Sequence, residues 1–332
     1  MSVHLDSPEE QQIMNKLDVV SVLLVAVAMM TSLGCSPSSE PRVEAEVEAP
    51  DPFESIACTN FNWVDHPGVA NRAGMVVPVI AGGATLGFQL STGAEVSIIP
   101  GGSAKKHDIE TLRNDADGKT FAVPMDLQLG GAHYPGQEIL VEPENSRTEP
   151  AGTIGLDLLV GKVVVLDLAY MRFCVSEPGA PEVSALLDKT EFTAAQLRDG
   201  KLFVEARLGD ETLDGLWFNT GASAFPLQVD LELWQRLTGR NGDEESNTLW
   251  EVTTQSESVT FVGAPALGKL QIGKAAIDVP MVFFQQDRPS AFKEWPVPVL
   301  GLLGNALFFE YAIVLDLRAD SPRFGILSVG IS

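Results

Sequence analysis

Two similar stretches of sequence, one in each half of the chain, decide the fold. FQLSTGAEVSII occupies residues 88–99, and LWFNTGASAFPL occupies residues 216–227. Each reads as an apolar strand, then x-Thr-Gly-Ala, then a return to apolar residues. A single Thr-Gly pair after a strand is most often just a turn, so one copy would predict little. Two copies indicate an internal repeat.

Three further pairs of signatures follow in the same order in both halves. They are DLQLGG (126–131) with KLQIGK (269–274), TIGLDLL (153–159) with LLGNALF (302–308), and VVLDLAYMRF (164–173) with IVLDLRADSPRF (313–324). The offsets between equivalent positions are 128 (219 minus 91), 143 (270 minus 127), 149 (304 minus 155) and 149 (316 minus 167). They never decrease, and an acidic insertion at 240–251 absorbs length differences. This order predicts two related lobes.

The local patterns predict an all-β protein. Residues 75–90 and 202–218 each contain two apolar strand runs joined by a glycine-containing turn, which predicts a hairpin that leads into the Thr-Gly turn. Helical signals are few. Residues 181–197 predict a helical connector between the lobes, and residues 229–237 predict a short helix.

The repeated pattern resembles the aspartic proteases of the pepsin and retropepsin group, from about residue 75 to residue 328. The resemblance implies an all-β, two-lobed pepsin/retropepsin-like acid protease fold, in which each β-barrel-like lobe places its turn at the interlobe cleft. The cleft turns would be formed by Thr92, Gly93, Ala94, Thr220, Gly221 and Ala222. The two threonine hydroxyls would tie the turns together. The segments crossing behind the turns would contain Ile154, Gly155, Leu303 and Gly304.

The residue before each Thr-Gly departs from the family pattern. Ser91 and Asn219 stand where the resemblance implies two catalytic aspartates. An aspartic protease needs two carboxylates at contact distance that share one proton. Serine and asparagine are neutral and cannot act as the base. We therefore expect an inactive protease-like protein that binds an extended peptide or acts as a scaffold. The alternatives are an aspartic-type endopeptidase with an atypical site, and a structural envelope lipoprotein with a filled cleft.

Other chemistries find little support in the sequence. Ser91 could act as a nucleophile only with a base, and the spacing of His66, His107 and His133 ties none of them to it. Glu95 could supply a substitute carboxylate, but its side chain starts from a different point in the turn. Because no metal-ligand spacing and no phosphate-binding glycine loop occurs, we expect no metal and no cofactor.

The N-terminus predicts export. An apolar run at 19–30 follows Lys16 and has the length of a signal-peptide core. TSLGC at 31–35 resembles the lipobox of bacterial lipoproteins, although Ser32 and Leu33 depart from it. This resemblance implies that Cys35 carries the lipid anchor. We expect a lipoprotein of the cell envelope that contacts the membrane only through this lipid, with an uncleaved membrane anchor as the alternative.

These observations divide the chain into five predicted segments. They are a signal peptide (1–34), a flexible acidic, proline-rich tether (35–57), an N-terminal lobe (58–178), a connector (179–198) and a C-terminal lobe (199–332). If Cys35 is lipidated, Cys58 and Cys174 remain as a pair in a compartment that permits disulfides. Two free buried thiols are the alternative.

Charge and repeat content limit the partners. A formal charge of −23, from 45 acidic and 22 basic side chains, opposes binding to nucleic acid. Because one chain supplies both lobes, we expect a monomer.

Overall fold

The computed structural model describes residues 51–66, 70–113, 118–253, 258–318 and 320–329. The predicted signal peptide, Cys35 and most of the predicted tether lie outside these residues. Strands dominate the described part, and its α-helices are α1 (Gly101–Lys106), α2 (Pro181–Lys189) and α3 (Leu231–Thr238). The predicted all-β fold is confirmed. No helix in this part is long and apolar enough to span a bilayer.

The N-terminal lobe is built on one sheet with the strand order β6-β7-β10-β5-β11-β4-β3-β8-β9, with β2 paired to β3. Its strands are β2 (Asn62–His66), β3 (Ala70–Ala81), β4 (Ala84–Leu90), β5 (Ile98–Pro100), β6 (Thr111–Arg113), β7 (Thr120–Ala122), β8 (Met125–Leu129), β9 (Ala132–Gln137), β10 (Leu140–Glu142) and β11 (Gly152–Ile154). The predicted β3–β4 hairpin turns at Gly82 and Gly83, whose φ angles of 56° and 87° favour glycine.

The C-terminal lobe repeats this arrangement in the second sheet. Its strands are β15 (Lys201–Leu208), β16 (Glu211–Phe218), β17 (Leu227–Val229), β18 (Thr248–Thr253), β19 (Ser258–Ala264), β20 (Lys269–Ile272), β21 (Ala275–Asp278), β22 (Val282–Gln285) and β23 (Gly301–Leu303). Strand β4 pairs in parallel with β11, and β16 pairs in parallel with β23. In both lobes the strand that leads into the Thr-Gly turn therefore pairs with the strand of the predicted crossing segment.

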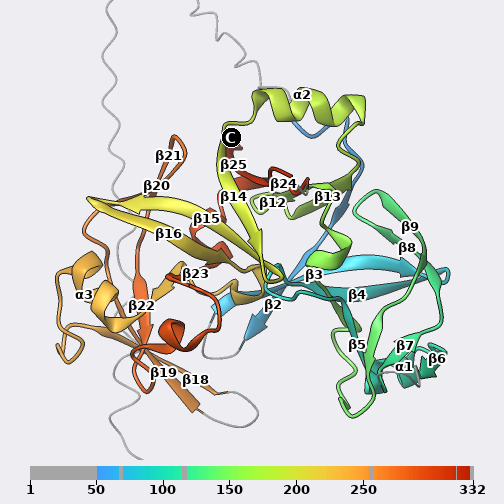
Figure 1. Ribbon diagram of the computed structural model, residues 1–332, viewed down its shortest axis with the longest axis horizontal. Coiled ribbons are helices and arrows are strands. Elements are labelled where there is room, and N and C mark those ends of the chain that lie inside the picture. Colours follow the sequence, from blue (N-terminus) through green and yellow to red (C-terminus); the bar gives the residue numbers. More distant parts are fainter. Residues whose placement is uncertain (1–50, 67–69, 114–117, 254–257, 319, 330–332) are drawn as a thin grey trace, which may run out of the picture. The chain divides into compact units, whose positions relative to one another are not determined.

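A third group of strands joins the lobes, in the order β1-β13-β12-β24-β25-β14. These are β1 (Cys58–Asn60), β12 (Val163–Asp167), β13 (Arg172–Ser176), β14 (Phe192–Arg198), β24 (Tyr311–Asp316) and β25 (Arg323–Ser328). Strands β12 and β24, which occupy equivalent positions in the two repeats, pair antiparallel at the centre of this group (Figure 1). Strand β14 also pairs with β15, so these strands continue into the sheet of the C-terminal lobe.

Two buried aspartates end the central strands. Asp167 and Asp316 are both fully buried, and each meets arginine side chains. Arg172 Nε donates to Asp167 Oδ2 at 2.7 Å, while Arg318 Nε donates to Asp316 Oδ1 at 2.8 Å. Burial alone would raise the pKa of Asp316, but hydrogen bonds from Arg318 and Arg323 outweigh it and lower that pKa below its usual value.

The tether prediction needs correction at its C-terminal end. Residues 51–57 are folded: Phe53 is 1% exposed and Ile56 is 7% exposed, and both pack with Val183 of α2 against the central strands. Arg172 also forms an ion pair with Asp51. The proline-rich composition predicts a spacer, but it does not show that two apolar side chains within it have a place in the core.

The predicted helical connector is also shorter than expected. Helix α2 ends at Lys189, and the Thr190 hydroxyl donates to the carbonyl oxygen of Leu186 at 2.8 Å. Residues 192–198 then form β14. The apolar residues of this segment fit a strand between β25 and β15 better than a longer helix, because both neighbours offer backbone partners. The short helix predicted at 229–237 is confirmed as α3.

Candidate functional site

The two Thr-Gly turns meet through four hydrogen bonds between the lobes. The Thr92 hydroxyl donates to Phe218 O at 2.9 Å and accepts from Thr220 N at 3.1 Å. The Thr220 hydroxyl donates to Leu90 O at 3.0 Å and accepts from Thr92 N at 3.0 Å. Both threonines are fully buried. Each side chain therefore satisfies a backbone donor and a backbone acceptor of the opposite lobe.

Ser91 and Asn219 face each other across this junction. Ser91 Oγ donates to Asn219 Oδ1 at 3.4 Å. Asn219 Oδ1 also accepts from Gly221 N at 2.8 Å, which orients the amide. Both side chains are half-buried. The structure thus brings the two predicted dyad positions together, with a hydroxyl and an amide in place of two carboxylates.

Glycine is needed beside each of these side chains. A Cβ atom on Gly93 would lie 2.4 Å from Asn219 Nδ2, and one on Gly221 would lie 2.7 Å from Ser91 Oγ. Both distances are too short for non-bonded atoms. Each glycine therefore makes room for the side chain from the opposite lobe. Ala94 and Ala222 complete the two turns, and both are half-buried.

The predicted crossing segments lie directly behind the turns. Ser91 N donates to Ile154 O at 3.0 Å, and Asn219 N donates to Leu303 O at 2.9 Å. A Cβ atom on Gly155 would lie 2.6 Å from the carbonyl carbon of Val96, and one on Gly304 would lie 2.2 Å from Phe225 O. Two backbones cross so closely here that only glycine fits.

Two supporting contacts were not predicted. Ser97 Oγ donates to Asp157 Oδ1 at 2.7 Å and accepts from Gly155 N at 3.0 Å, which braces the first crossing. Asn305 is fully buried behind the second turn and donates to Ser223 Oγ at 2.8 Å. The signal for both was a polar residue inside an otherwise apolar run, in TIGLDLL and LLGNALF.

The other candidate catalytic groups make contacts elsewhere. Glu95 is exposed, and its side chain packs against Gly200 in the β14–β15 turn. His107 caps α1, and His133 lies 3.9 Å from Asp126. The side chain of His66 is outside the described part of the structure. No contact in the described ranges joins Ser91 to a base.

The structure also joins Cys58 to Cys174 by a disulfide between neighbouring strands β1 and β13, with the Cα atoms 4.2 Å apart. Within the described ranges, no group of three or more His, Cys, Asp or Glu side chains could hold a metal ion. The expectation of no metal and no cofactor stays a prediction.

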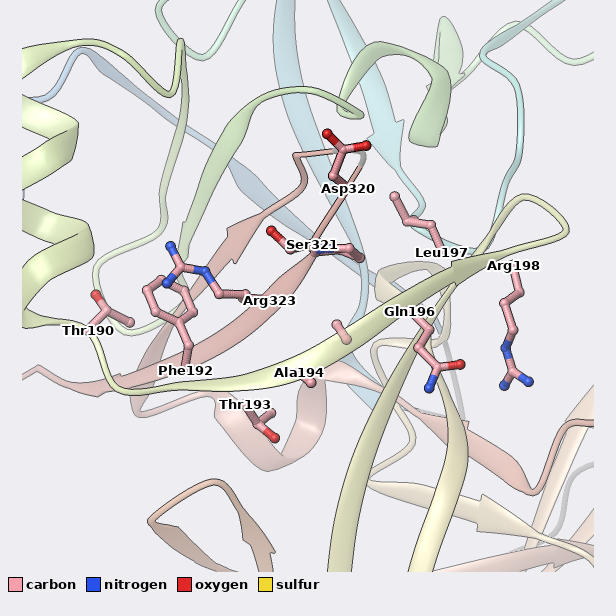
Figure 2. Close-up of a pocket in the computed structure, with 12 residues that line it drawn as sticks. Thr190, Phe192, Thr193, Ala194, Gln196, Leu197, Arg198, Asp320, Ser321 and Arg323 are labelled. Atoms are coloured by element: carbon pink, nitrogen blue, oxygen red, sulfur yellow. The ribbon is translucent and has the colours of Figure 1, made fainter.

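A pocket in the described part of the chain does not include the predicted site. It has a volume of about 820 Å³ and lies between β14 and the turn before β25 (Figure 2). Figure 2 shows Asp320 and Ser321 on that turn, with Arg198 at the far end of β14. Arg323, which also lines it, already pairs with Asp316. None of the predicted site residues lines this pocket.

Comparison with known proteins shows a likeness in structure but none in sequence. No known protein family and no curated protein matches this chain in sequence. The chain is similar in structure to the aspartic proteinase from Irpex lacteus. The TM-score is 0.47 and the sequence identity is 13%, over 78% of this chain and 95% of the proteinase.

Proposed function

We propose that this protein is a catalytically inactive, protease-like protein that binds an extended peptide. The observation that carries the proposal is the contact between Ser91 Oγ and Asn219 Oδ1 at 3.4 Å. It sits where the threonine hydrogen bonds and the two glycines hold opposing side chains together. The turns that would hold a catalytic pair are present, but the two side chains that they hold, the Ser91 hydroxyl and the Asn219 amide, are neutral.

The chemistry of the pair supports binding over hydrolysis. Neither side chain can take a proton from water at neutral pH, and loss of general acid–base assistance costs on the order of 10² to 10⁴ in rate. A serine hydroxyl and an asparagine amide can still donate to and accept from a peptide backbone. Such a site can hold a carbonyl or an N–H group without activating water.

The test combines a cleavage assay with a binding assay. Purified protein is incubated with a peptide library from acid to neutral pH, with and without an active-site inhibitor of aspartic proteases, and peptide binding is measured by calorimetry. We expect binding without cleavage, and weaker binding by Asn219→Ala. Inhibitor-sensitive cleavage would instead support an atypical endopeptidase. Absence of both activities would support a structural lipoprotein with a filled cleft.

We further propose that the protein is a monomeric envelope lipoprotein anchored through Cys35. The support is the apolar run at 19–30 followed by the lipobox-like TSLGC at 31–35. The matching experiment is fractionation of cells that express the wild type or Cys35→Ala. The variant should leave the membrane fraction, and unchanged fractionation would contradict the lipid anchor.

A further inference from the structure

A second pocket lies in the C-terminal lobe beside β16, the strand that leads into the turn at Asn219. Its volume is about 520 Å³, and its walls come mainly from residues 292–300, together with Arg198 and Asp214. The apolar part of the wall consists of Phe292, Trp295, Pro296, Val297, Pro298, Val299 and Leu300. Leu300 N donates to Gly215 O at 3.0 Å, which fixes this segment against β16. The two prolines restrict its backbone further.

Arg198 is the unusual member of this wall. Its guanidinium lies over the Phe203 ring at 4.2 Å, and its Nε atom is buried. Within the part of the chain that the structure describes, Nε has no hydrogen-bond acceptor and Arg198 forms no ion pair. In a chain with 45 acidic and 22 basic residues, carboxylates are abundant. Arg198 is itself only half-buried and lines the pocket, so a ligand can bring an acceptor to its guanidinium.

A second cation lies on the neighbouring aromatic surface. Lys201 Nζ is 5.5 Å from the centre of the Trp217 ring and 5.3 Å from that of Trp295. The two rings contact each other edge to face at 4.9 Å. Trp295 is 38% exposed, so a ligand can reach its ring. Lys201 likewise forms no ion pair in the described ranges.

In the described ranges, no ion pair joins the remaining charged groups at the pocket to these two cations. Lys293 pairs with Glu232 at 2.8 Å, so its charge is already compensated. Asp214 lines the pocket, but no contact within 4 Å joins it to Arg198. This pocket therefore combines an apolar wall with a guanidinium that forms no ion pair in the described part of the chain.

We propose that this pocket binds a carboxylate carried next to an apolar side chain. A planar guanidinium can bind a carboxylate through two hydrogen bonds, and the aromatic wall would cover the apolar group. The carboxylate can come from an acidic side chain or from the C-terminus of a peptide. This inference extends the proposed function, and it depends on that function for the assumption that the ligand is a peptide. Trp217 lies near the end of β16, two residues before Asn219, whose backbone is still extended, so the two side chains share a face. Ala222 packs against the apolar cluster that contains Trp217.

The test measures binding of three fluorescent peptides by anisotropy. They are acetyl-Ala-Val-Phe-Val-Glu-Ala-amide, the same peptide with Gln in place of Glu, and the Gln peptide with a free C-terminal carboxylate. We expect at least one carboxylate peptide to bind about tenfold or more tightly than the Gln amide. Arg198→Gln should abolish this preference, and Trp295→Ala should weaken binding of all three. The peptide that gains most identifies the source of the carboxylate.

Arg207→Gln is the matched control, because Arg207 is an exposed arginine on β15 that lines neither pocket. It should leave all three affinities unchanged. If the wild type binds the peptides equally, or if Arg198→Gln keeps the preference, the inference fails while the proposed function stands.

A second probe separates the pocket from the peptide site. N-acetylphenylalanine and its amide are titrated while the tryptophan indole signals are followed by NMR. One outcome would be that no peptide binds, while N-acetylphenylalanine binds more tightly than its amide and loses this preference in Arg198→Gln. That outcome would support the pocket proposal and contradict the proposed peptide-binding function. If neither carboxylate probe is preferred, the pocket proposal is overturned.

Discussion

Replacing both facing residues, by Ser91→Asp together with Asn219→Asp, should create a pair of carboxylates that share one proton. The side chains of the native residues are 3.4 Å apart at their closest hydrogen-bonding atoms. Two unit charges at that distance repel by about 5 kcal/mol at an effective dielectric constant of about 20. This corresponds to a rise of about 3 to 4 units in the pKa for the second ionisation of the pair.

The direction of the stability change follows from that rise. When the pKa of a carboxyl group is higher in the folded protein than in the unfolded chain, the folded state binds the proton more tightly. Lowering the pH then stabilises the folded state. Relative to the wild type, the double variant should therefore gain free energy of unfolding, by several kcal/mol, as the pH falls from about 8 to about 5. Each single variant has only one carboxylate and a neutral partner, so it should lack this pH dependence.

The assay is urea unfolding of the wild type, both single variants and the double variant at pH 5 and pH 8. The double variant is the smallest change that could also cleave peptides at acid pH, because Thr92, Thr220 and the neighbouring glycines are in place. Equal pH dependence in the double and single variants would refute the close approach of the two positions. Inhibitor-sensitive turnover by the wild type would refute the inactive assignment.

Four other outcomes can be measured. Thr92→Val should lower the free energy of unfolding by about 2 to 4 kcal/mol, because Phe218 O and Thr220 N lose their buried hydrogen-bond partner. Thr92→Ser keeps the hydroxyl and should lower it by less than about 1 kcal/mol. Urea unfolding measures both. Cys58→Ala with Cys174→Ala should cost about 2 to 5 kcal/mol in the same assay, because the disulfide closes a loop with a sequence separation of 116. Asp316→Asn should destabilise the protein at pH 7, and the difference from the wild type should shrink as the pH falls below 3.8 through the lowered pKa of Asp316, as followed by thermal unfolding against pH. Cys35→Ala should move the protein out of the membrane fraction.

The junction between the lobes was predictable because its geometry restricts residue type directly. Gly155 and Gly304 lie where two backbones cross, and Thr92 and Thr220 reach backbone groups of the opposite lobe. These requirements select the same residue types at equivalent positions in both halves of the repeat. A single sequence therefore shows them as a matching pattern.

The errors arose where tertiary contacts outweighed local composition. Residues 51–57 have the composition of a spacer, yet Phe53 fills a space beside α2. Residues 192–198 follow a helix and could extend it, but β25 and β15 offer backbone partners on both sides. The pocket beside Arg198 was also invisible in sequence, because its walls come from parts of the chain about 100 residues apart.

The pairing of β12 with β24 has a consequence for the origin of the chain. Val165 pairs with Val314, which is its own counterpart 149 residues later (314 minus 165). Asp167 pairs with Ala312 while its counterpart Asp316 pairs with Val163, so the register reads the same from either strand. A half-length ancestor with only the first of these strands could have paired with a second copy of itself in this register. The register is therefore the one that two identical strands would form across a twofold axis, with Val165 and Val314 at the centre of the pairing.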